Sequence, residues 1–210
     1  MNKKKIGKVI IAGAGPGDPG MITLRAKEAI ESAEVVVYDY LANPDFLKYA
    51  PPGAEMIYVG KKGGDHTMKQ PDINRLLVDK GLEGKRVVRL KGGDPLIFGR
   101  GSEEAEVLYS NGVPFEIVPG LPAAIGAAAT AGIPLTDRRH TSTLAFVTGH
   151  EDPTKPESSI NWEHLAKSAG TIVFYMGVKN LPDIAKRLME FGRPPDTPAG
   201  IVEWGTTPEQ

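Results

Sequence analysis

Short apolar runs alternate with amphipathic stretches along the first half of the chain. The apolar runs are rich in Val and Ile and predict buried strands at 9–12, 34–38, 56–59, 87–90 and 115–118. Between them, apolar residues recur at helical spacing and predict helices at 23–32, 73–80 and 102–110, with a short helix that begins at Asn43 and Pro44. Strands that alternate with helices favour a mainly parallel sheet covered on both faces.

The second half continues this alternation after Pro119 and Gly120, which we interpret as a domain boundary. Strands are predicted at 144–148, 171–175 and 199–202, and helices at 123–131, 162–167 and 181–191. The chain is therefore predicted to form two α/β lobes, residues 1–118 with a mainly parallel sheet and residues 119–210 with a mixed sheet. Because no helix follows the last strand, we expect the second lobe to be small or to lack its last elements.

Composition and charge narrow the class of protein. The chain has 210 residues and a net charge of −1, so no overall field selects nucleic acid or an anionic membrane. It has no cysteine, which excludes disulfides and thiolate metal sites. The apolar run at 6–12 is too short for a signal peptide, and we expect a soluble, cytoplasmic protein. The histidines lack the spacing of metal ligands, and no metal site is predicted at His66, His140, His150 or His164.

The loop after the strand at 87–90 is the most informative stretch of the chain about function. Gly92 and Gly93 let a ligand approach the backbone, and ligands of open α/β sheets bind at the carboxyl ends of strands. Asp94 and Arg100 supply charge of both signs there. Ser102 is the predicted N-cap of the next helix, whose first turn holds two glutamates that suit the helix dipole. An ordinary turn is the alternative interpretation.

The first glycine-rich loop, 13–19, invites a comparison with dinucleotide-binding loops. Asp18 stands where that fingerprint has its third glycine, and Pro16 removes an N–H donor, so a pyrophosphate is disfavoured. Asp39, at the end of the second strand, occupies the place of a ribose-binding acid and keeps a nicotinamide-binding oxidoreductase as an alternative. A glycine-rich loop without phosphate chemistry better suits S-adenosylmethionine.

Basic residues gather in three predicted loops. If these loops share one edge of the sheet, they favour a polyanionic small molecule, because arginine binds carboxylates bidentately. For each individual lysine, however, solvated surface charge is the favoured interpretation. The residues concerned are Lys61, Lys62, His66 and Lys69, then Lys91 and Arg100, then Arg138, Arg139 and His140.

Motifs in the same order along nearly the whole chain resemble those of the uroporphyrinogen-III C-methyltransferase family of the tetrapyrrole methylase superfamily. They lie at 13–19, 37–41, 59–66, 70 with 73–74, 89–104, 118–120, 131–136, 147–150, 173–177 and 202–206. The resemblance implies a homodimer of two-lobed chains that bind S-adenosylmethionine in the cleft between the lobes. It also implies methylation of an acidic tetrapyrrole, uroporphyrinogen III, at C2 and C7 to give precorrin-2, on the way to sirohaem and cobalamin.

The resemblance also implies roles for individual residues. Arg100, Glu103 and Arg138 match substrate-handling positions, and Asp39 matches a position implicated in catalysis. The proton that leaves as the ring rearranges would pass to Asp39 or Glu103. The implied cofactor contacts are Pro16, Gly92, Gly93, Asp94, Ile97, Pro122, Ala123, Met176 and Gly205.

The chain departs from the family's pattern in two places. Pro122 stands where the family usually has a hydroxyl residue, and the family continues beyond the segment that holds Gly205. We therefore expect a chain that ends at Gln210 to bind the cofactor weakly or not at all, and an inactive folded fragment is one alternative. A methylase of a later corrin precursor is another, although the uninterrupted motifs at 91–95 and 98–101 favour the early substrate.

Overall fold

The computed structural model describes residues 5–60, 68–151 and 158–210 of the chain. Its contacts divide the chain into two compact units, Met1–Ala127 with Trp204–Gln210, and Ala128–Glu203. The division falls within helix α4 (Ala123–Thr130). No helix among the described residues is long and apolar enough to cross a membrane.

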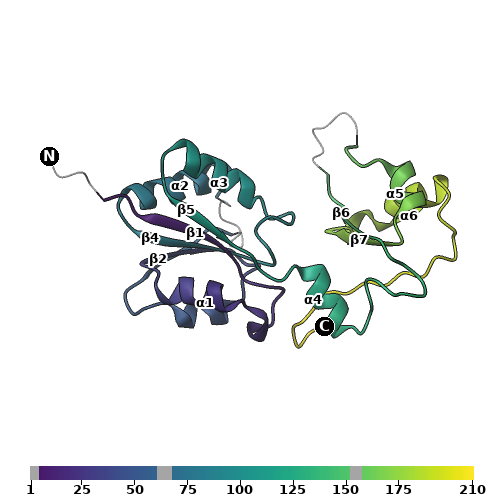
Figure 1. The fold of residues 1–210 in the computed structure, drawn as a ribbon, viewed down its shortest axis with the longest axis horizontal. Coiled ribbons are helices and arrows are strands. Elements are labelled where there is room, and N and C mark those ends of the chain that lie inside the picture. Colours follow the sequence, from purple (N-terminus) through teal and green to yellow (C-terminus); the bar gives the residue numbers. More distant parts are fainter. Residues whose placement is uncertain (1–4, 61–67, 152–157) are drawn as a thin grey trace. The chain divides into compact units, whose positions relative to one another are not determined.

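The first unit is built on a five-stranded sheet with the order β3-β2-β4-β1-β5, in which every pairing is parallel. Figure 1 shows α1 on one face of this sheet and α2 with α3 on the other. This is the α/β fold with a parallel N-terminal sheet that the alternation of strands and helices predicts. The strands are β1 (Lys8–Gly13), β2 (Val35–Tyr38), β3 (Glu55–Tyr58), β4 (Arg86–Lys91) and β5 (Phe115–Val118), and the helices are α1 (Leu24–Glu31), α2 (Gln70–Leu82) and α3 (Gly101–Ser110).

Alternate strand residues form two separate cores because successive side chains point to opposite faces of a sheet. On one face, Val87 packs in a cluster with Leu77 of α2 and Leu108 of α3. On the other, Val88 packs in a cluster with Ile30 of α1. The odd-numbered residues of β4 therefore face α2 and α3, which decides where the charged residues of this strand lie.

Local capping explains where the helices of the first unit begin. The Thr23 hydroxyl accepts a hydrogen bond from the Ala26 N–H and begins α1. Asn43 caps the predicted short helix, which is the 3-10 helix η2 (Pro44–Tyr49). The prediction that Ser102 is the N-cap of α3 is wrong. The N-cap is Arg100, with φ 58°, two residues earlier, because the Gly101 N–H donates to the Pro95 carbonyl (2.9 Å) and closes the preceding turn.

The second unit contains a parallel pair of strands, β6 (Leu144–Thr148) and β7 (Thr171–Tyr175), within the lobe that is predicted to hold a mixed sheet. Trp162 stacks on Phe174 with ring centroids 6.1 Å apart, and the Arg187 guanidinium lies 5.3 Å from the Trp162 ring. The predicted strand at 199–202 is wrong: these residues form no strand and Ile201 is 61% exposed. A strand needs a neighbouring strand that pairs with its backbone N–H and C=O groups, and no described residue pairs with 199–202 in a sheet. The helices are α5 (Trp162–Ser168), η3 (Val178–Asn180) and α6 (Leu181–Glu190).

Candidate functional site

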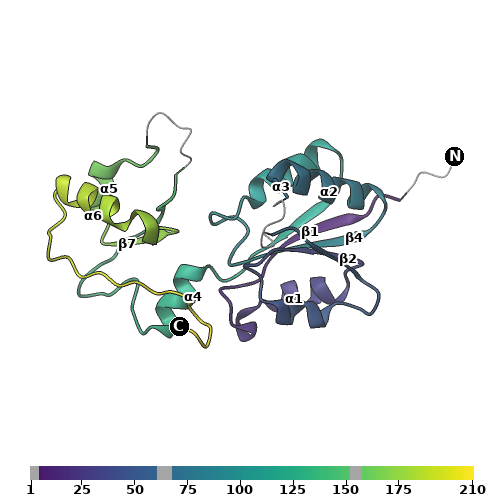
Figure 2. The ribbon, with the colours of Figure 1, turned by 180° about the vertical axis from the view of Figure 1, so that it is seen from behind.

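The loops after β1 and β4 leave neighbouring strands toward opposite faces of the sheet. The chain passes from β1 through the 3-10 helix η1 (Pro19–Met21) to α1, and from β4 to α3 on the other face. Figure 2 shows these helices from behind, again on opposite sides of the sheet. In an open parallel sheet, such a point at the carboxyl ends of the strands is where ligands bind. The candidate site is this edge of the first unit.

At this edge three strand ends meet backbone to backbone. Gly15 and Gly93 exchange hydrogen bonds, with the Gly15 N–H 3.2 Å from the Gly93 carbonyl and the Gly93 N–H 2.7 Å from the Gly15 carbonyl. A Cβ on Gly120, after β5, would lie 2.2 Å from the Gly93 carbonyl oxygen. A Cβ on Gly92 would lie 2.6 Å from that of Leu41. Packing of the loops against one another therefore requires glycine at positions 92 and 120, whereas the sequence analysis explained Gly92 by the approach of a ligand.

Asp94 fixes the loop that follows β4. Its Oδ1 accepts from the Leu96 N–H (2.8 Å) and its Oδ2 from the Gly120 N–H (3.0 Å), so both oxygens bind backbone. The Ile97 N–H donates to the Asp94 carbonyl at 3.4 Å. Asp94 and Ile97, both predicted cofactor contacts, thus belong to one tight turn whose position is set by the end of β5.

The first loop packs against the segment Trp204–Gln210 and against α4. The Asp18 carboxylate accepts from the Gly20 N–H (2.7 Å) and caps η1 instead of facing a phosphate. The Asp18 N–H donates to the Thr206 hydroxyl at 3.1 Å. A Cβ on Gly126 would lie 2.6 Å from the Pro16 ring. A Cβ on Gly17 would lie 3.6 Å from the Gly205 carbonyl oxygen, so the structure brings the predicted Pro16 and Gly205 positions to one place.

The predicted contacts at the start of α4 belong to the same unit. The Pro122 carbonyl accepts from the Ile125 N–H at 3.0 Å and begins the helix. The Ala123 N–H lies 3.7 Å from the Cβ position of Gly93, which is an ordinary contact distance. Ala123 therefore adjoins the Gly93 loop, and the cofactor contacts of Pro122 and Ala123 stay predictions.

Beneath these loops lies a buried cluster of charged side chains. Arg89 donates from Nη2 to Asp39 Oδ2 (2.8 Å) and from Nε to Glu104 Oε1 (3.2 Å). Lys91 Nζ and Gln70 Nε2 also donate to Glu104 Oε1, at 3.0 and 3.1 Å. The Glu104 side chain is 0% exposed, and its Oε2 has no hydrogen-bond partner among the described residues.

The sequence did not predict this cluster. Surface charge was the favoured interpretation for Lys91, and it is wrong, because the Lys91 side chain is 6% exposed. Burial lowers the pKa of Lys91, and the nearby Arg89 charge lowers it further. The available signal was the pair of cations on alternate positions of an apolar strand, which places both on one face. Asp39, the predicted catalytic residue, is 18% exposed and is the member of the cluster most open to solvent.

Arg100 and Glu103, the predicted substrate residues of the first unit, form an exposed pair. Arg100 Nε and Nη2 donate to the two carboxylate oxygens of Glu103 at 2.8 and 2.7 Å. This hydrogen bonding lowers the pKa of Glu103. The two side chains are 55% and 48% exposed, so the guanidinium is held in place while part of it stays available.

The remaining predicted residues lie elsewhere. Arg138 is exposed and belongs to the second unit, as does Met176, which is 58% exposed with φ 58°. Their predicted contacts stay predictions. Lys69 is exposed beside the start of α2. Lys61, Lys62 and His66 lie outside the described residues.

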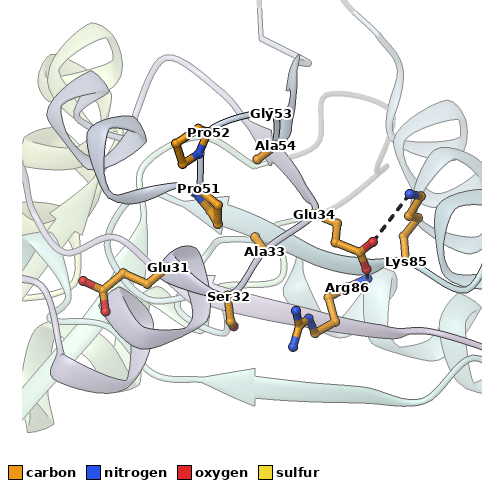
Figure 3. A pocket seen from close by; sticks show the side chains of 10 residues that line it. All are labelled: Glu31, Ser32, Ala33, Glu34, Pro51, Pro52, Gly53, Ala54, Lys85 and Arg86. Carbon is orange, nitrogen blue, oxygen red and sulfur yellow. Dashed lines mark hydrogen bonds and ion pairs between the residues drawn. The ribbon is translucent and has the colours of Figure 1, made fainter.

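A cavity of about 300 Å³ lies at the opposite edge, where β2 and β4 begin (Figure 3). In its lining, Glu34 pairs with Lys85 at 3.5 Å and accepts from the Arg86 N–H at 2.9 Å. It contains none of the predicted site residues. Among the described residues no group of three His, Cys, Asp or Glu side chains could hold a metal ion.

Together the fold and the candidate site define an α/β protein with glycine-rich loops at the carboxyl edge of a parallel sheet. The chain belongs to the tetrapyrrole methylase family, because the family model described as Tetrapyrrole (Corrin/Porphyrin) Methylases matches residues 8–210.

Several relatives match nearly the whole chain. An S-adenosyl-L-methionine-dependent uroporphyrinogen III methyltransferase from Methanosarcina barkeri is 56% identical over 97% of this chain and 80% of its own length. A uroporphyrinogen-III C-methyltransferase from Bacillus subtilis is 53% identical over 98% of this chain and 79% of its own. The solved uroporphyrin-III C-methyl transferase of Thermus thermophilus, complexed with S-adenyl homocysteine, is 39% identical with a TM-score of 0.81, and covers 97% of this chain and 80% of that one.

Proposed function

We propose that this protein transfers methyl groups from S-adenosylmethionine to C2 and C7 of uroporphyrinogen III and yields precorrin-2. The observation that carries the proposal is the identity of 56% over 97% of the chain with a relative named for this activity. The uninterrupted loop after β4, with its Arg100–Glu103 pair, supports the same substrate.

The loops fit S-adenosylmethionine better than a dinucleotide. Asp18 and Asp94 place carboxylates on both loops, which disfavours phosphate and tolerates a cation. S-adenosylmethionine has no phosphate and supplies a methyl group on a sulfonium, already activated for transfer to an electron-rich carbon. In the first unit the residues proposed to hold it are Pro16, Gly92, Gly93, Asp94, Ile97, Pro122, Ala123 and Gly205.

The protein's own contribution is mainly alignment and proton transfer. Holding the reacting groups in line is an effect that supplies roughly 7–11 kcal/mol of barrier lowering in favourable cases. Arg100 would bind a substrate carboxylate while Glu103 fixes its guanidinium. Asp39 lies at the carboxyl end of β2 and is partly open to solvent, so it is the proposed acceptor of the departing proton.

We also propose a cytoplasmic homodimer. Large apolar side chains are exposed on the loops after β2 and β4, as expected of a surface that a second copy covers. They are Tyr40, Leu41, Leu96 and Phe98, with exposures of 68%, 58%, 54% and 42%. Light scattering after gel filtration tests the assembly, and a monomer at micromolar concentration would contradict it.

The activity is tested in an anaerobic assay with S-adenosylmethionine and uroporphyrinogen III. We expect the absorption of precorrin-2 and release of S-adenosylhomocysteine. Turnover of a later corrin precursor alone, or binding of NAD in place of S-adenosylhomocysteine, would contradict the proposal.

Arg100→Ala tests the substrate site within that assay. We expect it to raise the KM for the tetrapyrrole by about tenfold or more while the Kd for S-adenosylhomocysteine changes little, because a carboxylate loses its bidentate partner. Arg86→Ala, an exposed arginine at the opposite edge of the sheet, is the matched control. Equal weakening of both ligands by Arg100→Ala would assign Arg100 a structural role instead.

A further inference from the structure

Strand β4 places two cations inside the protein. Arg89 and Lys91 lie on the same face of the strand as Val87, the face that α2 and α3 cover. Their side chains are 3% and 6% exposed. Central parallel strands are normally apolar throughout, since buried charge is unfavourable unless it is paired. These cations therefore require a reason beyond the packing of the sheet.

Every nitrogen of the Arg89 guanidinium has an acceptor. Nη2 donates to Asp39 Oδ2 at 2.8 Å, Nε to Glu104 Oε1 at 3.2 Å, and Nη1 to the Leu90 carbonyl at 2.9 Å. Because the guanidinium is planar and rigid, contacts on three sides fix its orientation. The group that it presents to Asp39 is therefore held in one direction.

Glu104 anchors this arrangement from helix α3. Its Oε1 binds Lys91 and Gln70 as well as Arg89, so α2, α3 and β4 converge on one oxygen. With Asp39, the cluster contains two carboxylates and two cations and is formally neutral. Such pairing lets Arg89 stay buried without an uncompensated charge.

Asp39 connects the cluster to the carboxyl edge of the sheet. Its Oδ2 binds Arg89 from below, and its Oδ1 accepts from the Leu41 N–H at 3.0 Å in the following loop. It is the partly exposed end of a chain of contacts in which Arg89, Lys91 and Glu104 are buried. Two donors thus orient this carboxylate: the Leu41 N–H in the loop, and the Arg89 guanidinium, whose side chain is only 3% exposed.

We propose that Arg89 is a positioning residue that aims the Asp39 carboxylate, with Glu104 as its buried anchor. The inference rests on the proposed function, in which Asp39 takes part in methylation. It gives strand β4 a role in orienting Asp39, and this role is separate from that of the glycine-rich loop that follows the strand.

Arg89→Lys tests the proposal, because lysine keeps the charge and loses the rigid three-sided geometry. We expect kcat to fall by about 10–100-fold, as for a misplaced catalytic group, with each KM within about threefold of wild type. Arg86→Lys, the same change at the exposed end of the same strand, is the control and should leave kcat unchanged. An unchanged kcat in Arg89→Lys would overturn the proposal.

A double-mutant cycle with Asp39→Asn separates positioning from a merely structural role. If Arg89 acts through Asp39, adding Arg89→Lys to Asp39→Asn lowers kcat no further, although it still lowers Tm. If the fold-losses of kcat in the two single variants multiply in the double variant, the proposal is overturned. Arg89→Gln, which keeps one donor without the charge, provides a second cycle at a temperature where its fold is intact.

Wild-type turnover is measured first and decides the proposed function separately. If a later corrin precursor is the substrate, the same cycle is run with that compound. A crystal structure of Arg89→Lys adds a readout independent of activity: the Asp39 carboxylate should leave its position beside residue 89. A carboxylate that stays in place would overturn the inference even in an active enzyme.

Discussion

Glu104→Gln is the sharpest test of the buried cluster. The substitution keeps the size and shape of the side chain and removes one negative charge. It leaves Arg89 and Lys91 in a buried site with Asp39 as their remaining carboxylate. The new amide also cannot accept three hydrogen bonds as a carboxylate oxygen does.

The expected loss of stability is large. Removing one partner of a buried ion pair costs about 3–5 kcal/mol. Lys91 limits the loss by releasing its proton, because burial lowers its pKa. We therefore expect the lower end, about 3 kcal/mol, which raises the unfolding equilibrium constant roughly 100-fold.

The loss should also depend on pH. In the variant, folded Lys91 binds its proton more weakly than the unfolded chain does, so the unfolded state holds more protons. Stability relative to wild type should therefore recover as the pH rises toward 10.5, the ordinary lysine value. No recovery in alkaline solution would mean that Lys91 is not the residue that relieves the charge.

Urea unfolding and hydrogen exchange measure the effect. Exchange resolves the two units, and protection should fall in β4 and α3 while the second unit is unaffected. Glu103→Gln is the matched control, since it is the adjacent residue of the same helix with an exposed partner, and it should cost under about 1 kcal/mol. Equal costs for the two variants would refute the buried, coupled geometry of Glu104.

Two further predictions concern the frame of the site. Gly120→Ala should lower stability by about 1–3 kcal/mol and abolish S-adenosylhomocysteine binding in calorimetry, because its Cβ meets the Gly93 carbonyl at 2.2 Å; unchanged binding would show that the strand ends need not be this close. Glu116, whose pKa is lowered by hydrogen bonds from Lys8 and Arg25, contributes stability that is present above its ordinary value of 4.5 and is lost as the pH falls through the lower folded value. Thermal melts of Glu116→Gln should therefore depend less on pH in that acid range, and parallel melting curves would contradict the assignment.

Local pattern was sufficient for most of the elements of the first unit. Strands and helices follow the periodicity because packing on both faces of the sheet uses the alternation of strand residues and the spacing of helix residues. The motifs in order along the chain were sufficient to indicate the family. Prediction failed for 199–202, because an apolar run becomes a strand only beside a partner. It also failed for Ser102, because a turn closed by the Pro95 carbonyl moved the start of α3.

Local patterns therefore establish the alternation of elements, the glycine-rich loops and the residues that resemble a family's site. The burial of Lys91, the anchoring of the cluster by Glu104 and not by its neighbour Glu103, and the contact between Arg89 and Asp39 depend on how the chain folds in three dimensions. Asp39 and Arg89 are 50 positions apart, and they meet because β2 and β4 are adjacent in the sheet. No local pattern contains the order of strands, which is set by how all the strands and helices bury their apolar faces together.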